Sequence, residues 1–114
     1  MLPVSMLEVH YYVAETGISP FAEWFASLDP VARAKVATAV ARIEQGNLSN
    51  VKSVGEGVLE FRIDFGPGYR VYMGRDGDVL VILLIGGTKR RQQRDIRAAA
   101  EFWKTYKRTR RSRR

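Results

Sequence analysis

The sequence predicts an α+β fold with a small, curved and mostly antiparallel sheet, because two kinds of pattern follow one another along the chain. After one short alternating stretch come two stretches with the apolar spacing of helices. Three strand-like stretches and a final helical pattern complete the chain. Helices followed by consecutive strands with tight turns favour an antiparallel meander. The predicted order is β-α-α-β-β-β-α, with an N-terminal helical hairpin and a C-terminal helix.

The first predicted elements are a strand at residues 6–13 and two helices that each begin at a capping residue followed by proline. Ser19 and Asp29 are favourable N-caps, and proline is favoured at the first helical position. The apolar stripes have helical spacing and consist of Phe21, Trp24, Phe25 and Leu28, then Ala32, Val36, Ala39, Val40 and Ile43. The second helix is expected to end near Gln45, and residues 47–57 are expected to form a loop.

The centre of the sheet is predicted from residues 58–85. Two alternating strands joined by a Gly-Pro-Gly turn are followed by an Asp-Gly turn and a third strand that is apolar on both faces. The third strand should therefore be central, or covered on both sides. Alternation places Arg62, Arg70 and Tyr72 on one face, opposite the apolar core. Lys89 follows the third strand and is expected to join this cluster, which suits a phosphodiester ligand.

The final helix is predicted to run from Lys89 to about Tyr106, with Thr88 as its N-cap. Four cations in its first two turns oppose the helix dipole, and a bound phosphate would relieve that repulsion. Residues 107–114 carry six positive charges, which leaves 13 basic and 12 acidic side chains in the rest of the chain. The sequence therefore predicts a single domain at residues 1–106 and a basic, disordered tail.

The composition excludes several classes of protein. The 114 residues contain no cysteine and a single histidine, His10, so neither a thiolate metal site nor a histidine pair is available. No apolar run approaches the ~20 residues of a membrane span, and no basic segment precedes an apolar run as in a signal peptide. We expect a cytoplasmic protein with no membrane partner. No metal or cofactor is expected, and the Gly-Pro-Gly turn lacks the spacing of a phosphate-binding loop.

Metal-free RNA cleavage is compatible with the residues present. RNA supplies its own nucleophile in the 2′-OH, and arginines such as Arg62 and Arg70 can stabilise the charged phosphorane. A lysine or tyrosine can transfer protons where neighbouring cations lower its pKa, and Lys89 is expected to have such neighbours. An equal alternative is that Arg62 and Arg70 are surface cations paired with Glu60 or Asp64.

Two segments, LEFRIDFGPGYRVYM at 59–73 and LLIGGTKRRQQRDIRAA at 83–99, resemble the RelE/ParE toxin superfamily and specifically the HigB-like addiction-module killer proteins. The upstream helical hairpin fits as well, so the resemblance spans about Leu7 to Tyr106. The positions that match are Glu60, Arg62, Gly66, Pro67, Gly68, Tyr69, Arg70, Val71, Tyr72, Gly86, Gly87, Lys89, Gln92, Asp95 and Ile96.

This resemblance implies the toxin of a type II toxin–antitoxin module that cleaves mRNA on the ribosome by attack of the 2′-OH, without metal. It implies a cognate antitoxin, often with a helix-turn-helix domain, through which the complex would contact operator DNA. The implied catalytic residues are Arg62, Arg70, Lys89 and Tyr72, and the expected RNA-binding residues are Tyr69, Arg90, Arg91 and Arg94. Two alternatives remain: a ParE-like poison of DNA gyrase without ribonuclease activity, and an inactive toxin that serves as an interaction module.

Overall fold

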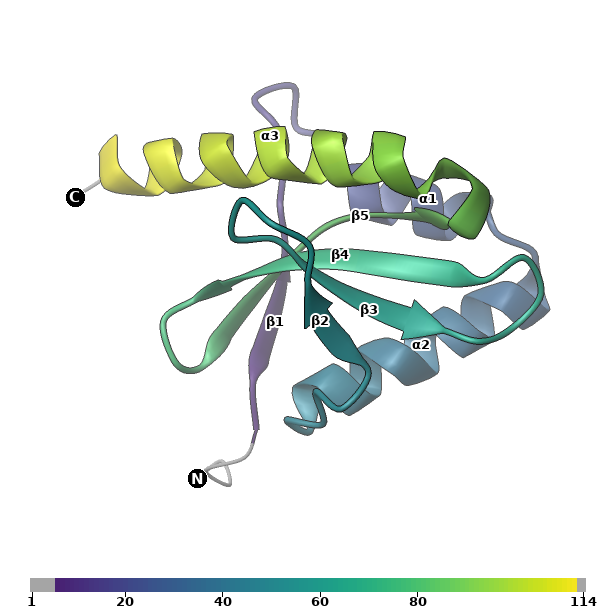
Figure 1. The fold of residues 1–114 in the computed structure, drawn as a ribbon. Coiled ribbons are helices and arrows are strands. Elements are labelled where there is room, and N and C mark those ends of the chain that lie inside the picture. Colours follow the sequence, from purple (N-terminus) through teal and green to yellow (C-terminus); the bar gives the residue numbers. More distant parts are fainter. Residues whose placement is uncertain (1–5, 113–114) are drawn as a thin grey trace.

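A computed structural model describes residues 6–112 and shows a five-stranded sheet with helices on both faces (Figure 1). The elements in chain order are β1 (Glu8–Tyr11), α1 (Pro20–Ser27), α2 (Pro30–Glu44), β2 (Val51–Ser53), β3 (Leu59–Ile63), β4 (Tyr69–Asp76), β5 (Leu80–Thr88), a 3₁₀ turn (Lys89–Arg91) and α3 (Gln92–Ser112). The α+β fold with its helical hairpin and C-terminal helix is confirmed. No helix within residues 6–112 is long and apolar enough to cross a membrane.

The sheet has the strand order β1-β5-β4-β3-β2, in which β1 is parallel to β5 and all other pairs are antiparallel. The predicted meander is present as β3, β4 and β5. One prediction was wrong: β2 lies within residues 47–57, where a loop was expected, and it pairs Val51 with Phe61 and Ser53 with Leu59. Three residues are too short to show a period of two, and β2 is held by backbone pairing to its neighbour.

The helices α1 and α2 cover one face of the sheet, and both predicted N-caps are confirmed. The Ala22 amide donates to Ser19 Oγ over 3.1 Å, and the Ala32 amide donates to Asp29 Oδ1 over 2.9 Å. The core between these helices and the sheet is apolar and includes Phe21, Val36, Ala39, Ile43, Phe61, Val71, Met73, Val81 and Leu83. The stripes predicted for the two helices therefore face the sheet.

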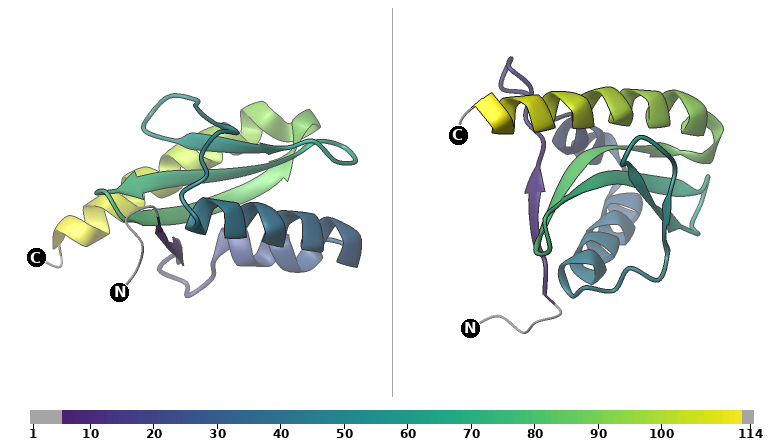
Figure 2. Two further views of the ribbon diagram at one scale, coloured as in Figure 1. Left: turned by 90° about the horizontal axis from the view of Figure 1, so that it is seen from below. Right: turned by 60° about the vertical axis from the view of Figure 1, so that its left-hand side comes forward.

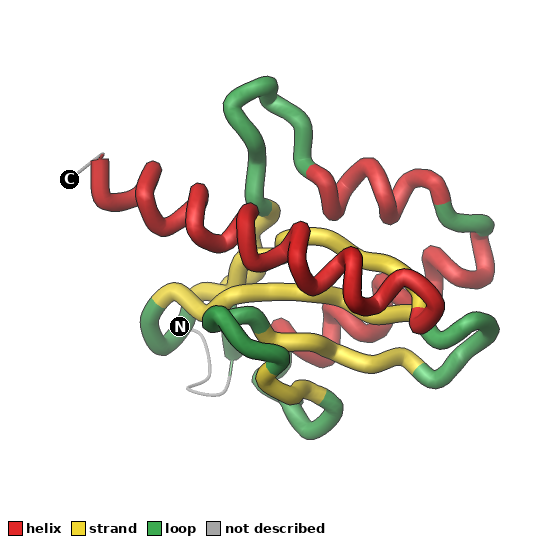
Figure 3. The backbone as a smooth tube through the Cα atoms, turned by 45° about the horizontal axis from the view of Figure 1, so that its top comes forward, coloured by secondary structure: helices red, strands yellow, loops and turns green. Residues whose placement is uncertain are grey.

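The helix α3 covers the opposite face, where a second core contains Tyr12, Val58, Tyr72, Ile82, Leu84, Ala99, Ala100 and Trp103. The strand β5 supplies side chains to both cores, so the prediction that it is covered on two sides is confirmed. Figure 3 shows α3 crossing the sheet, with strands continuing beyond it. The helix packs on β5 and β4, while Lys52 of β2 and Arg62 of β3 are exposed on this face.

Both ends of α3 differ from the predicted bounds. Thr88 occupies the N-cap position of the 3₁₀ turn, but its side chain makes no capping hydrogen bond. The helix continues to Ser112 instead of ending near Tyr106, so the first six residues of the predicted tail are helical, and residues 113–114 lie outside the described range. Asp76 in β4 binds the extension, because it accepts hydrogen bonds from Tyr106 over 2.7 Å and from Arg110 over 2.8 Å.

Candidate functional site

The strands β3 and β4 bring the predicted cations together at one corner of the sheet. Arg62 and Arg70 are direct cross-strand partners, and Glu60 is opposite Tyr72. Lys89 joins them because its backbone amide donates to Gly68 O over 2.8 Å. The corner therefore unites two strands with the start of the last helical segment.

The Gly-Pro-Gly turn holds this corner. Gly68 has φ +77°, a left-handed conformation that glycine adopts without strain. Its carbonyl accepts both the Lys89 amide and, over 2.8 Å, Nη1 of Arg70. A Cβ at Gly68 would lie 2.9 Å from that Nη1 atom and 3.4 Å from the Cβ of Lys89. The turn thus positions both cations through one carbonyl, and a side chain at residue 68 would crowd them.

Burial divides the predicted site residues into two groups. The exposed side chains are Arg62, Lys89, Arg90, Arg91 and Arg94. The buried ones are Arg70, Tyr72 and Tyr69, which are 3%, 0% and 8% exposed. Tyr69 packs its ring beside those of Trp24 and Phe65. In this conformation the surface offers only the exposed cations to a ligand, and the buried residues can act only through their neighbours.

Glu60 is the centre of the buried group, whereas the sequence indicated no buried role for it. It is 1% exposed and accepts a hydrogen bond from Gln92 Nε2 over 2.8 Å. The Glu60 carboxylate lies 3.9 Å from Nε of Arg70 and 3.9 Å from Nζ of Lys52. Pairing with Glu60 therefore applies to Arg70, whereas the Arg62 guanidinium has no ion pair within residues 6–112. Glu60 compensates the charge of a buried arginine and leaves Arg62 available.

The environment of Tyr72 determines which form of its phenol is present. Burial raises the pKa of Tyr72 well above the ordinary value, and the negative charges of Glu60 and Asp95 raise it further. The positive charge of Arg70 offsets only part of this effect. Tyr72 is thus a protonated phenol at neutral pH, which suits a hydrogen-bond donor and not a general base.

The Gly86-Gly87 pair lets helices approach β5 closely from both faces. A Cβ at Gly86 would overlap the Trp24 ring of α1, and a Cβ at Gly87 would overlap the carboxylate of Asp95 in α3. Asp95 is buried, and this burial raises its pKa above the usual value, while the positive charges of Arg91 and Arg94 partly offset the rise. The glycine pair therefore sets the height of the first turns of α3 above the sheet, and with it the position of the exposed cations.

A polar pocket of about 270 Å³ lies beside Arg62, on the part of the sheet that α3 leaves open. Its lining consists of Ser49, Asn50, Val51, Lys52, Glu60, Arg62 and Asp64. The lining carries two cations, Lys52 and Arg62, and two carboxylates, Glu60 and Asp64, and Arg62 is in turn the cross-strand partner of Arg70 in the corner. Such an arrangement can bind phosphates of a single-stranded nucleic acid and accommodate an adjoining group.

Comparison with known proteins identifies the family. Residues 23–110 match the family model described as "Phage derived protein Gp49-like (DUF891)", so the match runs from α1 to near the end of α3. An uncharacterized protein of Haemophilus influenzae is 45% identical over 80 residues, which cover 69% of this chain and 81% of that protein. The matched family is a RelE-like toxin family. The chain therefore belongs to the phage-derived Gp49-like family of RelE-like toxins.

Proposed function

We propose that the protein is the toxin of a type II toxin–antitoxin module and a metal-independent endoribonuclease that cleaves mRNA on the ribosome. The observation that carries this proposal is the arrangement of Arg62, Arg70 and Lys89 at the corner of the sheet. Exposed Arg62 and Lys89 flank Arg70, whose charge is compensated internally by Glu60. The Gp49-like family supports a toxin, and the resemblance of residues 59–73 and 83–99 to HigB-like proteins favours RNA as its target.

In the proposed reaction the 2′-OH of the RNA loses its proton to solvent as its oxygen attacks the adjacent phosphorus, and the bond from phosphorus to the 5′-oxygen, which takes up a proton, breaks. The products are a cyclic phosphate and a free 5′-hydroxyl. Arg62 binds the non-bridging oxygens, where negative charge develops, and Lys89 acts in proton transfer to the leaving oxygen. Arg70 and Tyr72 hold the strands and the turn that position these two side chains, and they reach the phosphate only if the corner opens.

The exposed arginines after Lys89 would hold phosphates that flank the scissile bond. Arg90, Arg91 and Arg94 lie within the first turns of the last helical segment, next to Lys89. Phosphate binding there would relieve the repulsion between these cations and the helix dipole. Tyr69 would serve RNA binding by shaping the turn beneath Lys89, since its ring is buried.

The proposal implies partners and a compartment. A toxin of this kind requires a cognate antitoxin, expected to carry a helix-turn-helix domain, and operator DNA would be contacted only through the complex. The ribosome and its mRNA are cytoplasmic, so the protein would act in the cytoplasm without a membrane partner.

Mutation of the exposed cations tests the proposal. Lys89→Ala and Arg62→Ala should each lower cleavage of ribosome-bound mRNA by about 10²-fold, since Lys89 would transfer a proton and Arg62 would stabilise developing charge. Lys104→Ala is the control, since that lysine is exposed on α3 and pairs with Glu101 outside the corner. Cleavage is measured by primer extension on purified ribosomes programmed with a defined mRNA.

Two results would overturn the proposal. One is wild-type cleavage by both alanine variants, which would place the chemistry elsewhere. The other is inhibition of DNA gyrase in a supercoiling assay while mRNA in the same cells stays intact, which would favour the ParE-like alternative.

A further inference from the structure

The polar pocket beside Arg62 has a buried oxygen atom in its wall that lacks a hydrogen-bond partner. The atom is Oε1 of Glu60, whose side chain is fully buried, and it makes no hydrogen bond within residues 6–112. The other carboxylate oxygen, Oε2, accepts the hydrogen bond from Gln92. Buried carboxylate oxygens normally accept hydrogen bonds, and leaving one without a donor costs free energy. The pocket therefore contains an acceptor that a ligand can satisfy.

Lys52 places a donor next to this oxygen. Its Nζ lies 3.9 Å from Oε1 of Glu60, which is an ion pair but too long for a hydrogen bond, and its side chain is 59% exposed. An N–H group of a ligand can bond to Oε1 while the exposed ammonium turns to a neighbouring acceptor of the same ligand. The two side chains together suit a planar edge on which donors adjoin an acceptor.

The charges of the lining balance, because two cations, Lys52 and Arg62, stand beside two carboxylates, Glu60 and Asp64. A phosphate inside the pocket would lie near both carboxylates, whereas a neutral group with donors and acceptors is compatible with every side chain. Val51 adds an apolar surface. The volume of about 270 Å³ is below the roughly 300–1,000 Å³ of pockets that hold drug-sized ligands. These properties fit a single nucleobase.

Arg62 connects the pocket to the corner, because it lines the pocket and is the cross-strand partner of Arg70. The loop before β2 is held in place, since the Arg62 amide donates to Asn50 O over 3.3 Å and the Ser49 hydroxyl donates to Asn47 Oδ1 over 2.9 Å. Figure 2 shows the sheet between α3 and the helical hairpin, and β2 ends the sheet on one side. A base in the pocket would thus belong to a nucleotide whose phosphate adjoins Arg62.

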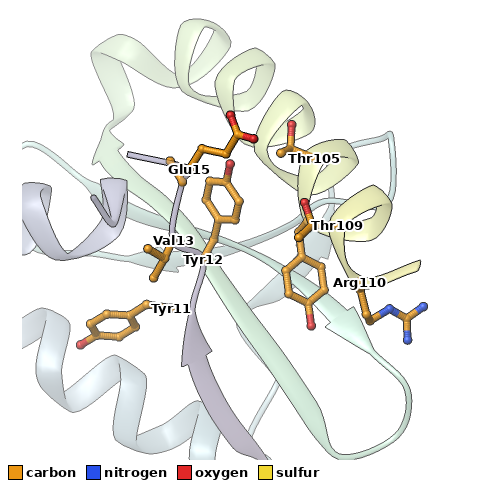
Figure 4. A pocket seen from close by; sticks show the side chains of 9 residues that line it. Tyr11, Tyr12, Val13, Glu15, Thr105, Thr109 and Arg110 are labelled. Carbon is orange, nitrogen blue, oxygen red and sulfur yellow. The ribbon is translucent and has the colours of Figure 1, made fainter. Parts of the chain in front are cut away.

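A larger cavity of about 560 Å³ lies between residues 11–15 and the last turns of α3 and lacks such a group. Figure 4 shows Tyr12, Thr105 and Arg110 among the side chains around it. Arg110 already donates to Asp76, and none of the unpartnered buried polar atoms within residues 6–112 belongs to this lining. The smaller pocket is therefore the one with a buried polar atom for a ligand to bind.

We propose that the pocket beside Arg62 recognises a guanine base of single-stranded RNA, an inference that rests on RNA as the ligand of the proposed function. One edge of guanine presents O6, N1–H and the N2 amino group in that order, an acceptor followed by two donors. Lys52 would donate to O6, and Oε1 of Glu60 would accept from N1–H and the amino group. Adenine has an amino group in place of O6, and uracil and cytosine have a carbonyl in place of the N2 amino group. Guanine alone therefore offers two adjacent donors beside an acceptor.

The test is equilibrium binding of trinucleotides that cannot be cleaved. Each has uracil at both ends, one of the four bases at the centre and hydrogen in place of every 2′-OH, and fluorescence anisotropy measures its affinity. The guanine trinucleotide should bind at least about tenfold more tightly than the other three, because paired hydrogen bonds to a base edge discriminate by this factor or more. Hypoxanthine lacks only the N2 amino group, and with hypoxanthine at the centre binding should weaken at least about threefold.

Glu60→Gln removes the acceptor and keeps the volume of the side chain. Gln92 and Arg70 both lie on the Oε2 side, so the amide oxygen of the variant should stay there and its NH₂ group should face the pocket. A donor would then oppose the donors of guanine, and the preference for guanine over adenine should fall below about twofold. Glu101→Gln is the matched control, since it removes the same charge from an exposed position on α3 and should leave the preference unchanged.

Lys52→Met provides a second variant, which leaves the core untouched because this side chain is exposed. It removes the donor to O6, the atom that distinguishes guanine from adenine at this position. The preference for guanine over adenine should therefore fall at least about threefold. Lys104→Met is its control, because it removes the same charge from α3 and should change the affinity for both trinucleotides equally.

Three results would overturn the inference. Wild type might bind the guanine and adenine trinucleotides within about twofold of each other, or Glu60→Gln and Lys52→Met could both keep the wild-type preference. Guanosine 5′-monophosphate could also bind as tightly as the guanine trinucleotide, which would make a free nucleotide the ligand. These measurements need no cleavage, so a guanine preference without mRNA cleavage would refute the ribonuclease proposal alone. Cleavage without a guanine preference would refute this inference alone.

Discussion

Arg62 and Arg70 face each other across β3 and β4, yet their environments are opposite. Arg70 is 3% exposed and lies against Glu60, while Arg62 is exposed beside an open pocket. The difference follows from α3, which packs on β4 and β5 and leaves the end of β3 uncovered. A shared sheet face therefore does not imply a shared role: Arg70 belongs to the framework of the corner, and Arg62 to its surface.

Replacement of Glu60 tests the framework role. Glu60→Ala should lower the free energy of unfolding by about 3 kcal/mol, because it leaves the buried Arg70 without a compensating charge. Lys52→Ala, which removes the exposed partner of the same carboxylate, should cost less than about 1 kcal/mol. Urea unfolding followed by tryptophan fluorescence measures both. The double change Glu60→Ala with Arg70→Met should recover part of the loss, and equal costs for both single variants would contradict this account.

The helix α3 extends from the cationic corner across the sheet. Its first turns lie over Gly87 and precede the core contacts of Ala99 and Trp103, and its last turns lie beside residues 11–15. The distal part is bound through Asp76, which accepts hydrogen bonds from both Tyr106 and Arg110. These hydrogen bonds attach the basic extension to the end of β4, and they stabilise α3 beyond Tyr106, where the helix was expected to end.

The pH dependence of stability tests the contact between Tyr106 and Asp76. Burial, the hydrogen bond to Asp76 and the charge of Asp76 raise the pKa of Tyr106 from 10.0 to about 12. The folded protein therefore keeps this proton to a higher pH than the unfolded chain, and stability falls as pH rises from 10.0 to about 12. Tyr106→Phe should lower stability at neutral pH by about 1 kcal/mol and make the alkaline fall shallower.

Urea unfolding of Tyr106→Phe and wild type at neutral pH and across the alkaline range provides the measurement. Asp76→Asn should also flatten the alkaline fall, because it removes the charge that holds the Tyr106 proton. Parallel stability curves for wild type and both variants would show that the contact between Tyr106 and Asp76 contributes nothing.

The charge of the molecule is unevenly distributed. The net charge of +7 derives mostly from the end of the chain, and the cations of the body gather where α3 begins. The exposed Tyr11 and Val13 lie toward the other end of α3, so the cationic corner and this apolar surface are separate.

Salt dependence of RNA binding measures the contribution of the corner. In Arg90→Ala with Arg94→Ala, the slope of log affinity for single-stranded RNA against log salt should fall by about 1.4, or about 0.7 per lost phosphate contact. The control is Lys35→Ala with Arg42→Ala, which removes the same charge from α2 on the opposite side of the sheet. Fluorescence anisotropy at several salt concentrations gives both slopes, and equal slopes would show that net charge alone governs binding.

Local patterns predicted much of this molecule. The caps Ser19 and Asp29, the stripes of α1 and α2 and the two-sided burial of β5 all follow from residues close in the sequence. The strand β2 was not predicted, because three residues are too few to show a period of two. The extension of α3 was not predicted, because its run of cations indicated a solvated tail. Both depend on contacts with distant residues, to β3 in one case and to Asp76 in the other.

Alternation along β3 and β4 was sufficient to put Arg62, Arg70 and Tyr72 on one face, because side-chain direction in a strand has a fixed period. It could not separate the exposed Arg62 from the buried Arg70 and Tyr72, nor show Glu60 beneath them. Burial depends on where α3 crosses the sheet, and that crossing is set by its packing on β4 and β5 and by the close approach of Asp95 to Gly87. The strand order also leaves β1 at one edge of the sheet, where it pairs with β5.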